Sequence, residues 1–143
     1  MEIRQATNDD VAALCAADRS AVDQERDPEG RRGVIRTWVG EGRAYLAVLD
    51  GALAGYTVFE HSFFGRGFVS MLMVDPAYRR RGVGSALVRH VEGLCESERI
   101  FTSTNQSNLP MQSLLAKLGY RHSGTVEDLD PGDPELFYSR QLR

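Results

Sequence analysis

The chain has 143 residues, of which 42% are hydrophobic and 26% charged, and its formal net charge is -3 at pH 7. This length and composition predict one globular domain, residues 1–143, and the acidic balance predicts no general attraction to nucleic acid or an anionic membrane surface. Apolar runs fall short of the roughly 18 residues that cross a bilayer, and the first residues lack a signal peptide's apolar region. We therefore expect a cytoplasmic protein without membrane or nucleic-acid partners.

Cysteine and histidine usage predicts neither a disulfide nor a metal site. Cys15 and Cys95 are the only cysteines, and both fall on apolar helix faces, as buried reduced thiols do. The three histidines have no metal-ligand spacing. We expect no metal cofactor.

The first forty residues predict one strand and two helices. Residues 2–6 are a short strand candidate, and Thr7 to Asp10 supply an N-cap hydroxyl and first-turn carboxylates for a helix. Residues 23–33 are charged and turn-rich, which predicts a mobile loop. A second short helix follows and ends at the glycines Gly40 and Gly42. Its apolar positions are Ile35, Trp38 and Val39.

Residues 44–60 predict a pair of antiparallel strands. Two apolar runs flank Asp50-Gly51, a dipeptide that tight hairpin turns prefer because both central residues need positive φ. A third strand is predicted over Phe68–Val74, after a glycine-containing bend at Gly65 and Gly67.

The second half of the chain predicts two helices and three strands. The first helix runs over about 82–97. The second is indicated by a stripe of apolar residues at helical spacing and ends at Gly119. The strands cover about 100–103, 120–127 and 136–142. The resulting order of elements indicates a single α/β domain with a mixed sheet and helices on both faces.

The stretch VDPAYRRRGVGSAL, residues 74–87, predicts an anion site. A strand that ends at Val74 and a helix that begins near Gly82 leave backbone N–H groups without helical acceptors. The helix dipole adds roughly half a positive charge there, and glycines at 82 and 84 let a phosphate approach the backbone. Three consecutive arginines, 79–81, strengthen the field. The alternative is a solvated surface turn.

Other phosphate motifs match less well. A P-loop needs a lysine after its second glycine, and Lys117 is the only lysine in the chain. The dinucleotide fingerprint needs glycine at position 87, where Leu87 stands, and it normally follows the first strand. A nucleotide-binding domain of another kind remains an alternative.

The turn and a later segment together resemble the GNAT superfamily of N-acetyltransferases. Arg79, Gly82 and Gly84 match its acyl-CoA signature Q/RxxGxG/A, preceded by the strand MLMVDP, and SNLPMQSLLAKLGY, 107–120, resembles its later block. The resemblance covers essentially the whole chain. It implies a mixed, mainly antiparallel splayed sheet of about seven strands, with four helices on both faces.

The resemblance also implies acetyl-CoA as cosubstrate. The backbone of residues 72–74 would pair with the pantetheine arm, the N–H groups between Arg80 and Ser85 would hold the pyrophosphate, and Asn108 or Asn105 would bind the pantetheine. Each asparagine is alternatively a helix cap. The implied cofactor-binding residues are Leu72, Met73, Val74, Arg79, Arg80, Arg81, Gly82, Val83, Gly84, Ser85, Asn105 and Asn108.

Catalytic residues are less well marked. Many family members carry a tyrosine, thought to protonate the leaving thiolate, at the position of Leu115. Tyr120 is more typical of the core, and Tyr138 on a late strand is a candidate. Glu60, at a strand end, is the best candidate for the base, with a solvated surface glutamate as the alternative. His61 is a second, weaker candidate.

Two acidic segments suggest the acceptor. Residues 127–135 carry five carboxylates, and residues 23–29 carry four, and both segments border the acceptor side in this family. Carboxylates attract cationic amines, so we expect a small-molecule or peptide primary amine. The alternatives are solvated loops and an acyl-CoA-binding domain without turnover that acts as a sensor or interaction module. Strand edges in this family also imply a possible homodimer.

Overall fold

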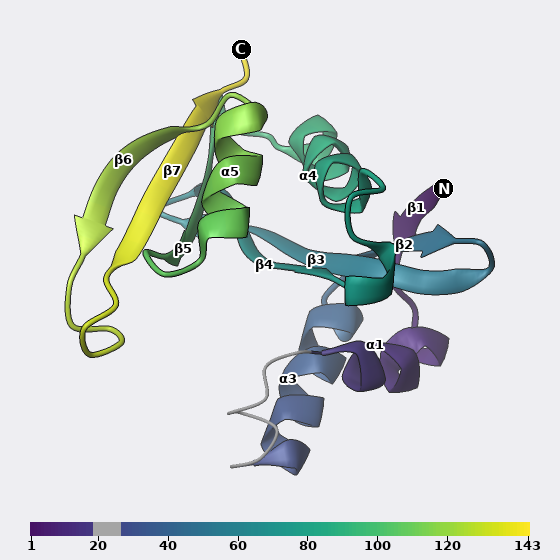
Figure 1. Ribbon diagram of the computed structural model, residues 1–143. Helices are drawn as coiled ribbons and strands as arrows, with labels where there is room; N and C mark the ends of the chain where they lie inside the picture. The colour runs from purple at the N-terminus through teal and green to yellow at the C-terminus, as the bar shows by residue number, and fades with distance from the viewer. Residues whose placement is uncertain (19–26) are drawn as a thin grey trace. The chain divides into compact units, whose positions relative to one another are not determined.

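The computed structural model describes residues 1–18 and 27–143. The chain divides into two compact units, Met1–Phe59 with Met71–Leu87, and Glu60–Ser70 with Val88–Arg143. Seven strands follow the order β1-β2-β3-β4-β5-β7-β6 (Figure 1). The pairing of β4 with β5 is parallel, whereas β1–β2, β2–β3, β5–β7 and β6–β7 are antiparallel. The predicted mixed, mainly antiparallel α/β fold is confirmed.

The elements of the first unit lie near the N-terminus and around the predicted anion site. They are β1 (Glu2–Gln5), the 3-10 turn η1 (Asn8–Asp10), α1 (Val11–Ala17), α3 (Pro28–Gly40), β2 (Ala44–Leu49), most of β3 (Ala52–Phe63), the end of β4 (Arg66–Val74), the 3-10 turn η2 (Pro76–Tyr78) and the start of α4 (Val83–Leu94).

The second unit contains the rest of β3, β4 and α4 and the elements after them. These are β5 (Arg99–Asn105), α5 (Leu109–Lys117), β6 (Arg121–Val126) and β7 (Glu135–Gln141). The part of the chain that the structure describes thus has four α-helices, and none of them is long and apolar enough to cross a membrane.

Alternating side chains give the strands of the first unit two buried faces. Leu46 and Tyr56 pack with Leu14 of α1 and Ile35 of α3. The intervening Ala47, with Ala54, packs with Val83 and Leu87 at the start of α4. The first turn of α4 is therefore fixed by apolar contacts to the strands that precede it.

Two hairpin turns use positive φ. Asp50 and Gly51 have φ of 54° and 76°, which confirms the turn predicted between β2 and β3. Phe64 and Gly65 have φ of 53° and 76°, so β3 continues to Phe63 and β4 begins at Arg66. The predicted bend at Gly67 is wrong, because Gly67 lies inside β4 and its N–H donates to Ser97 Oγ at 3.0 Å.

The mobile loop predicted over 23–33 is wrong for residues 28–33, which form the first turns of α3. Asp27 is the N-cap, and its carboxylate accepts from the Gly30 N–H at 2.9 Å. Pro28 occupies the first helical turn, where its missing N–H costs nothing. Residues 23–26 lie outside the described residues.

Neither cysteine forms a disulfide. Cys95 is buried and Cys15 is half-buried. Among residues 1–18 and 27–143, no group of three histidine, cysteine or acidic side chains could hold a metal ion.

Candidate functional site

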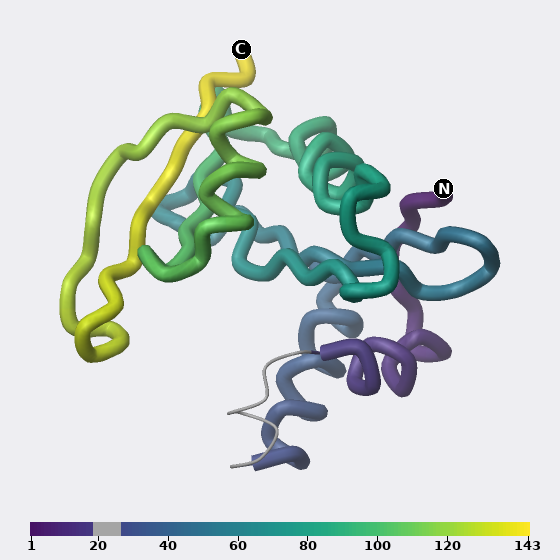
Figure 2. Tube along the Cα trace, viewed as in Figure 1, coloured from purple at the N-terminus to yellow at the C-terminus, as the bar shows by residue number. Residues whose placement is uncertain are grey.

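The turn between β4 and α4 presents unused backbone donors. Figure 2 shows the chain passing from β4 through this turn into α4. In the first backbone hydrogen bond of α4, the Ala86 N–H donates to the Gly82 carbonyl at 3.0 Å. The N–H groups of residues 83–85 precede it and so have no acceptor in the helix. The start of α4 is therefore a local concentration of positive potential.

The backbone before α4 is bent by two left-handed residues. Arg80 and Gly82 have φ of 63° and 79°. A Cβ placed on Gly82 would meet no atom within 4 Å, so the surface next to this glycine is open. Gly82 serves the backbone conformation, since a β-branched residue at this φ would be strained.

Three exposed arginines, 79–81, surround this turn. Arg81 lies 3.2 Å from the Asp50 carboxylate in the β2–β3 turn, and about half of each side chain or more is exposed. Such an exposed pair is weak. The turn therefore keeps a strong positive charge beside its unused N–H groups.

The end of β4 leads directly into this turn. Leu72, Met73 and Val74 are half-buried. The Asp75 N–H donates to the Ala54 carbonyl at 2.8 Å, which ties the strand end to β3. β4 pairs with β5 in parallel over Gly67–Val69, before this end of the strand.

Gly55 lets the end of β4 lie close to β3. A Cβ on Gly55 would stand 2.5 Å from the Met73 carbonyl oxygen and 3.1 Å from Val83 Cγ1. Contacts below 3.0 Å to backbone are not tolerated without movement. A glycine is therefore required here, and no local sequence pattern predicts it, because Gly55 and Met73 are 18 residues apart.

The two asparagines already have partners in the second unit. Asn108 is the N-cap of α5, and its Oδ1 accepts from the Met111 N–H at 3.2 Å. The Asn105 amide donates to Asp130 Oδ2 at 2.8 Å. The cap interpretation therefore describes Asn108, whereas Asn105 fastens the β6–β7 connection. Their roles toward a cofactor stay predictions.

The acidic segment 127–135 is partly tied down. Asp133 accepts from the Ser107 N–H at 3.0 Å and from Ser107 Oγ at 2.6 Å. Glu135 accepts from Ser103 Oγ at 2.7 Å. Glu127 and Asp128 are exposed. Of the other acidic segment, Asp23 and Glu25 lie outside the described residues.

Glu60 is half-buried and lies in the second unit. Its Oε1 accepts from Ser62 Oγ at 2.8 Å, which holds the carboxylate next to the strand. The neighbouring His61 uses Nε2 to accept from the Glu96 N–H at 3.0 Å. An imidazole that stabilises the chain after α4 is a poorer candidate for a base than Glu60.

Tyr138, Tyr120 and Leu115 bear on the search for an acid. Tyr138 is half-buried on β7, opposite Thr102 and edge-on to the ring of His122 at 5.7 Å. Tyr120 is buried, and its hydroxyl donates to Glu92 at 2.7 Å. Burial and this hydrogen bond raise the pKa of Tyr120, as a core residue requires. Leu115 is fully buried.

A buried ionic cluster in the first unit had no clear sequence signal. Asp18 at the end of α1 is 3% exposed, and it accepts from Arg31 Nε at 2.8 Å and from the Tyr56 hydroxyl at 3.0 Å. Arg31 also lies over the ring of Trp38 at 5.0 Å, a favourable cation–π distance. These residues join α1 and α3 to β3.

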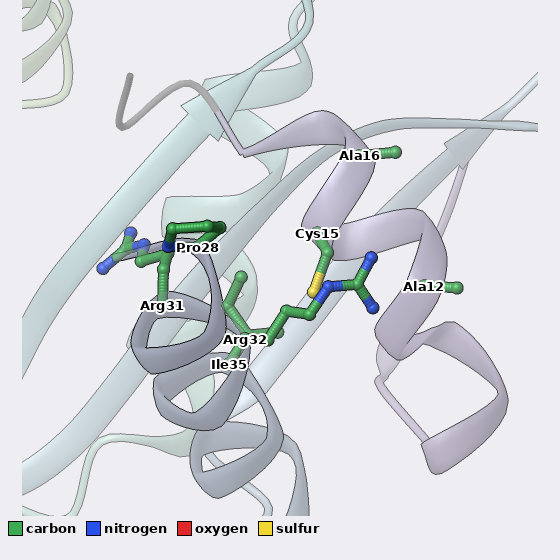
Figure 3. A pocket seen from close by; sticks show the side chains of 7 residues that line it. All are labelled: Ala12, Cys15, Ala16, Pro28, Arg31, Arg32 and Ile35. Carbon is green, nitrogen blue, oxygen red and sulfur yellow. The ribbon is translucent and has the colours of Figure 1, made fainter. Parts of the chain in front are cut away.

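A shallow cavity of about 250 Å³ lies between α1 and α3. Figure 3 shows Arg32 reaching from α3 toward α1, where Cys15 lies. The cavity is remote in sequence from the turn before α4, and its remaining lining is mostly apolar. The lining residues are Ala12, Cys15, Ala16, Pro28, Arg31, Arg32 and Ile35.

The model of the acetyltransferase (GNAT) family matches residues 11–120. The chain belongs to this family. A GNAT-family acetyltransferase from Bacillus cereus is 31% identical with a TM-score of 0.86, and the match covers 99% of this chain and 97% of that one.

Other GNAT relatives are more distant. N-alpha-acetyltransferase 30 from Dictyostelium discoideum is 29% identical over 82 residues, 53% of this chain and 44% of that protein, so the chain spans less than half the length of this relative. A streptothricin acetyltransferase structure from Bacillus anthracis, in complex with acetyl coenzyme A, has a TM-score of 0.69 at 17% identity. That match covers 76% of this chain and 68% of the other. It supports the fold alone.

Proposed function

We propose that the chain is an acetyl-CoA-dependent N-acetyltransferase that acetylates a primary amine of a cationic acceptor. The observation that carries the proposal is the turn before α4, where unused N–H groups of residues 83–85 lie beside Arg80 and the open side of Gly82. Membership of the GNAT acetyltransferase family supports it.

The residues of the turn suit a diphosphate. Backbone N–H groups at a helix start bind phosphate oxygens and gain from the helix dipole. Guanidinium groups at 79–81 add charge-assisted hydrogen bonds. The backbone of Leu72 to Val74 would hold the pantetheine arm as an added strand does. Acetyl-CoA supplies the activated acetyl thioester when it is bound.

Beyond cofactor binding, the reaction requires that the acceptor amine lose a proton. An alkyl amine with a pKa of about 10.4 is mostly protonated at pH 7, and its deprotonation costs about 4.6 kcal/mol. Glu60, directly or through water, takes this proton so that the neutral nitrogen can form the new C–N bond. A positioned base contributes roughly 10² to 10⁴ in rate.

Help for the leaving group matters less. The thiol has a pKa near 8.5, as cysteine does, and leaves readily as the thiolate when the C–S bond breaks. Leu115 cannot donate a proton, so no acid acts from that position. Tyr138 remains the candidate for one. The acceptor is cationic because exposed carboxylates such as Glu127 and Asp128 favour positive charge nearby.

Thiol release with a panel of amines tests the proposal. The purified chain is incubated with acetyl-CoA and with polyamines, amino acids or peptides, and free thiol is followed with time. We expect release above the amine-free rate for at least one cationic primary amine, and little for its N-acetylated form. Stabilisation by acetyl-CoA without release for any amine would favour the acyl-CoA-binding module. Stabilisation by ATP or NAD alone would favour another nucleotide-binding domain.

A further inference from the structure

Five of the six phenylalanines gather in the second unit. Phe63 lies between the others, stacked on Phe68 at 4.7 Å and on Phe137 at 5.7 Å between ring centroids, with Phe101 at 5.3 Å. Phe64 at the β3–β4 turn meets Phe63 edge-on and is 81% exposed. None of the five is buried. We call these residues the phenylalanine face.

Strand register explains why this face is not covered as the other is. Phe68 is opposite Phe101, and Phe137 is opposite Ser103. The alternate residues of β5, Ile100 and Thr102, are buried on the other side, where Arg140 of β7 reaches Glu92 of α4. The helices of this unit thus cover one side, and the aromatic rings occupy the opposite side.

The two ends of the phenylalanine face carry opposite charges. Arg66 and Arg99 each precede a ring of the face by two residues, so they share its side. At the other end, Glu135 precedes Phe137 in the same way and is opposite Asn105. The six residue-to-residue steps from Arg99 to Asn105 separate the two ends by about 20 Å.

These charges are not neutralised by ion pairs. Arg99 donates to Ser139 Oγ and Gln141 Oε1, which are uncharged acceptors. Arg66 donates to the Phe64 carbonyl. Within residues 1–18 and 27–143, neither arginine pairs with a carboxylate and Glu135 pairs with no cation.

We propose that a second copy of this chain docks on the phenylalanine face. A two-fold axis parallel to the sheet and perpendicular to its strands would stack ring on ring and bring each basic end onto the partner's acidic end. The patch is then self-complementary, as an isologous interface requires. A neutral apolar ligand or a lipid surface would satisfy the rings and leave the ordered charges at both ends unexplained.

The size of the face sets the expected strength. Four strands at about 4.8 Å spacing and a length of about 20 Å give roughly 400 Å² of sheet. The phenylalanine rings protrude from the sheet and the turn at Phe64 extends beyond it, so both enlarge the area. The total approaches the roughly 500 Å² per subunit of a small specific interface. We expect a reversible dimer with a dissociation constant on the order of 10 µM.

Sedimentation velocity between about 1 and 200 µM tests the dimer, because this range spans the expected dissociation constant. The mass should rise from one chain to two. Phe64→Asn removes the most exposed ring, and asparagine tolerates positive φ. It should raise the dissociation constant at least about tenfold. Leu109→Ser is the matched control, since Leu109 is 66% exposed on α5, and it should leave the constant unchanged.

A charge exchange tests the geometry. Arg99→Glu and Glu135→Arg should each weaken the dimer about tenfold or more, and the double variant should recover to within about threefold of the original. Thermal unfolding confirms that each variant is folded. A monomer throughout the range, a dimer indifferent to Phe64→Asn, or a double variant no better than the single ones would overturn the proposal. So would large aggregates in place of a dimer.

Discussion

Arg80 is the residue at which the fold and the proposed cofactor have different requirements. Its φ of 63° is unfavourable for a residue with a Cβ, while its guanidinium adds charge at the start of α4. Arg80→Gly should keep the free energy of unfolding or raise it by up to about 1 kcal/mol. It should weaken coenzyme A binding about three- to tenfold.

Isothermal titration with coenzyme A and urea unfolding measure the two effects of Arg80→Gly. Arg32→Ala is the control, because Arg32 is an exposed arginine on α3, and it should not change the affinity. An unchanged affinity in Arg80→Gly, or an equal loss in Arg32→Ala, would remove Arg80 from the proposed site.

Glu60 can be tested as a base through the pH dependence of the rate. Glu60→Gln should lower kcat/KM about 10²-fold at pH 7 and much less near pH 10, where an amine loses its proton unaided. Stopped-time thiol assays across this pH range measure the ratio. Ser62→Ala is the control, since it removes only the donor to Glu60 Oε1, and its loss should be smaller. An equal loss for Glu60→Gln at every pH argues against the base.

At this scale, local residue type decided what could be predicted. Asp50-Gly51 announced its turn because aspartate and glycine accept positive φ. Phe64 and Arg80 also have positive φ, but neither residue type favours it, so the sequence does not predict these conformations. The partner of Asn105 is Asp130, 25 residues away, so its hydrogen bond could not be derived from the neighbouring sequence.

At the scale of elements, α1 and α3 are joined to β3 through Asp18. The Asp18 side chain is fully buried and that of Arg31 is 12% exposed. Burial and the nearby Asp18 charge raise the pKa of Tyr56, which stays protonated and donates. Asp18→Asn should therefore lower the free energy of unfolding by about 3 kcal/mol.

Tyr56→Phe is the milder partner of this experiment. It removes one hydrogen bond and keeps the Asp18–Arg31 pair, so a loss of about 1 to 2 kcal/mol is expected. Urea unfolding at neutral pH measures both. A larger loss for Tyr56→Phe than for Asp18→Asn would show that the ionic pair does not hold the helices.

The pair Arg4–Asp10 joins β1 to η1 and gives a pH dependence. The hydrogen bond from Arg4 lowers the pKa of Asp10 from 3.8 to about 2. The folded pKa is below the unfolded one, so this stabilisation is complete above about pH 4 and is lost as the pH falls toward 2. Arg4→Met should flatten the change in unfolding free energy over this window, as followed by thermal unfolding at several pH values. An unchanged slope would contradict the assignment.

Elements were predicted well where apolar periodicity was strong, as in α4 and the β2–β3 hairpin. The start of α3 was missed because its first turns are charged. Asp27-Pro28 marks a helix start. In the sequence, however, Arg31 looks like a solvated residue, because its partner Asp18 is 13 residues away. Such long-range ion pairs override a composition that favours loops.

At the scale of the whole molecule, a bound cosubstrate should stabilise the fold. Acetyl-CoA at 100 times its dissociation constant adds about 2.7 kcal/mol, which corresponds to a rise in Tm of roughly 5 to 10 °C for a chain of this size. Differential scanning fluorimetry measures the rise in Tm, with adenosine as a control that lacks the diphosphate. An equal rise with adenosine would argue against a diphosphate grip.

The order of elements, the short signature at 79–84 and the later block 107–120 were enough to predict the family and the sheet. The acceptor could not be predicted in the same way. In the proposed function, its recognition depends on side chains in connections, such as Glu127 and Asp128, whose surroundings are set by folding and not by any local pattern.

The bonds from Asn105 and Ser107 to Asp130 and Asp133 have a practical consequence for protein engineering. The connection before α5 and the one before β7 behave as a single piece. A chimera that takes only one of them from another acetyltransferase would lose the partners of these hydrogen bonds. Exchanging both segments together would keep these hydrogen bonds and the local fold.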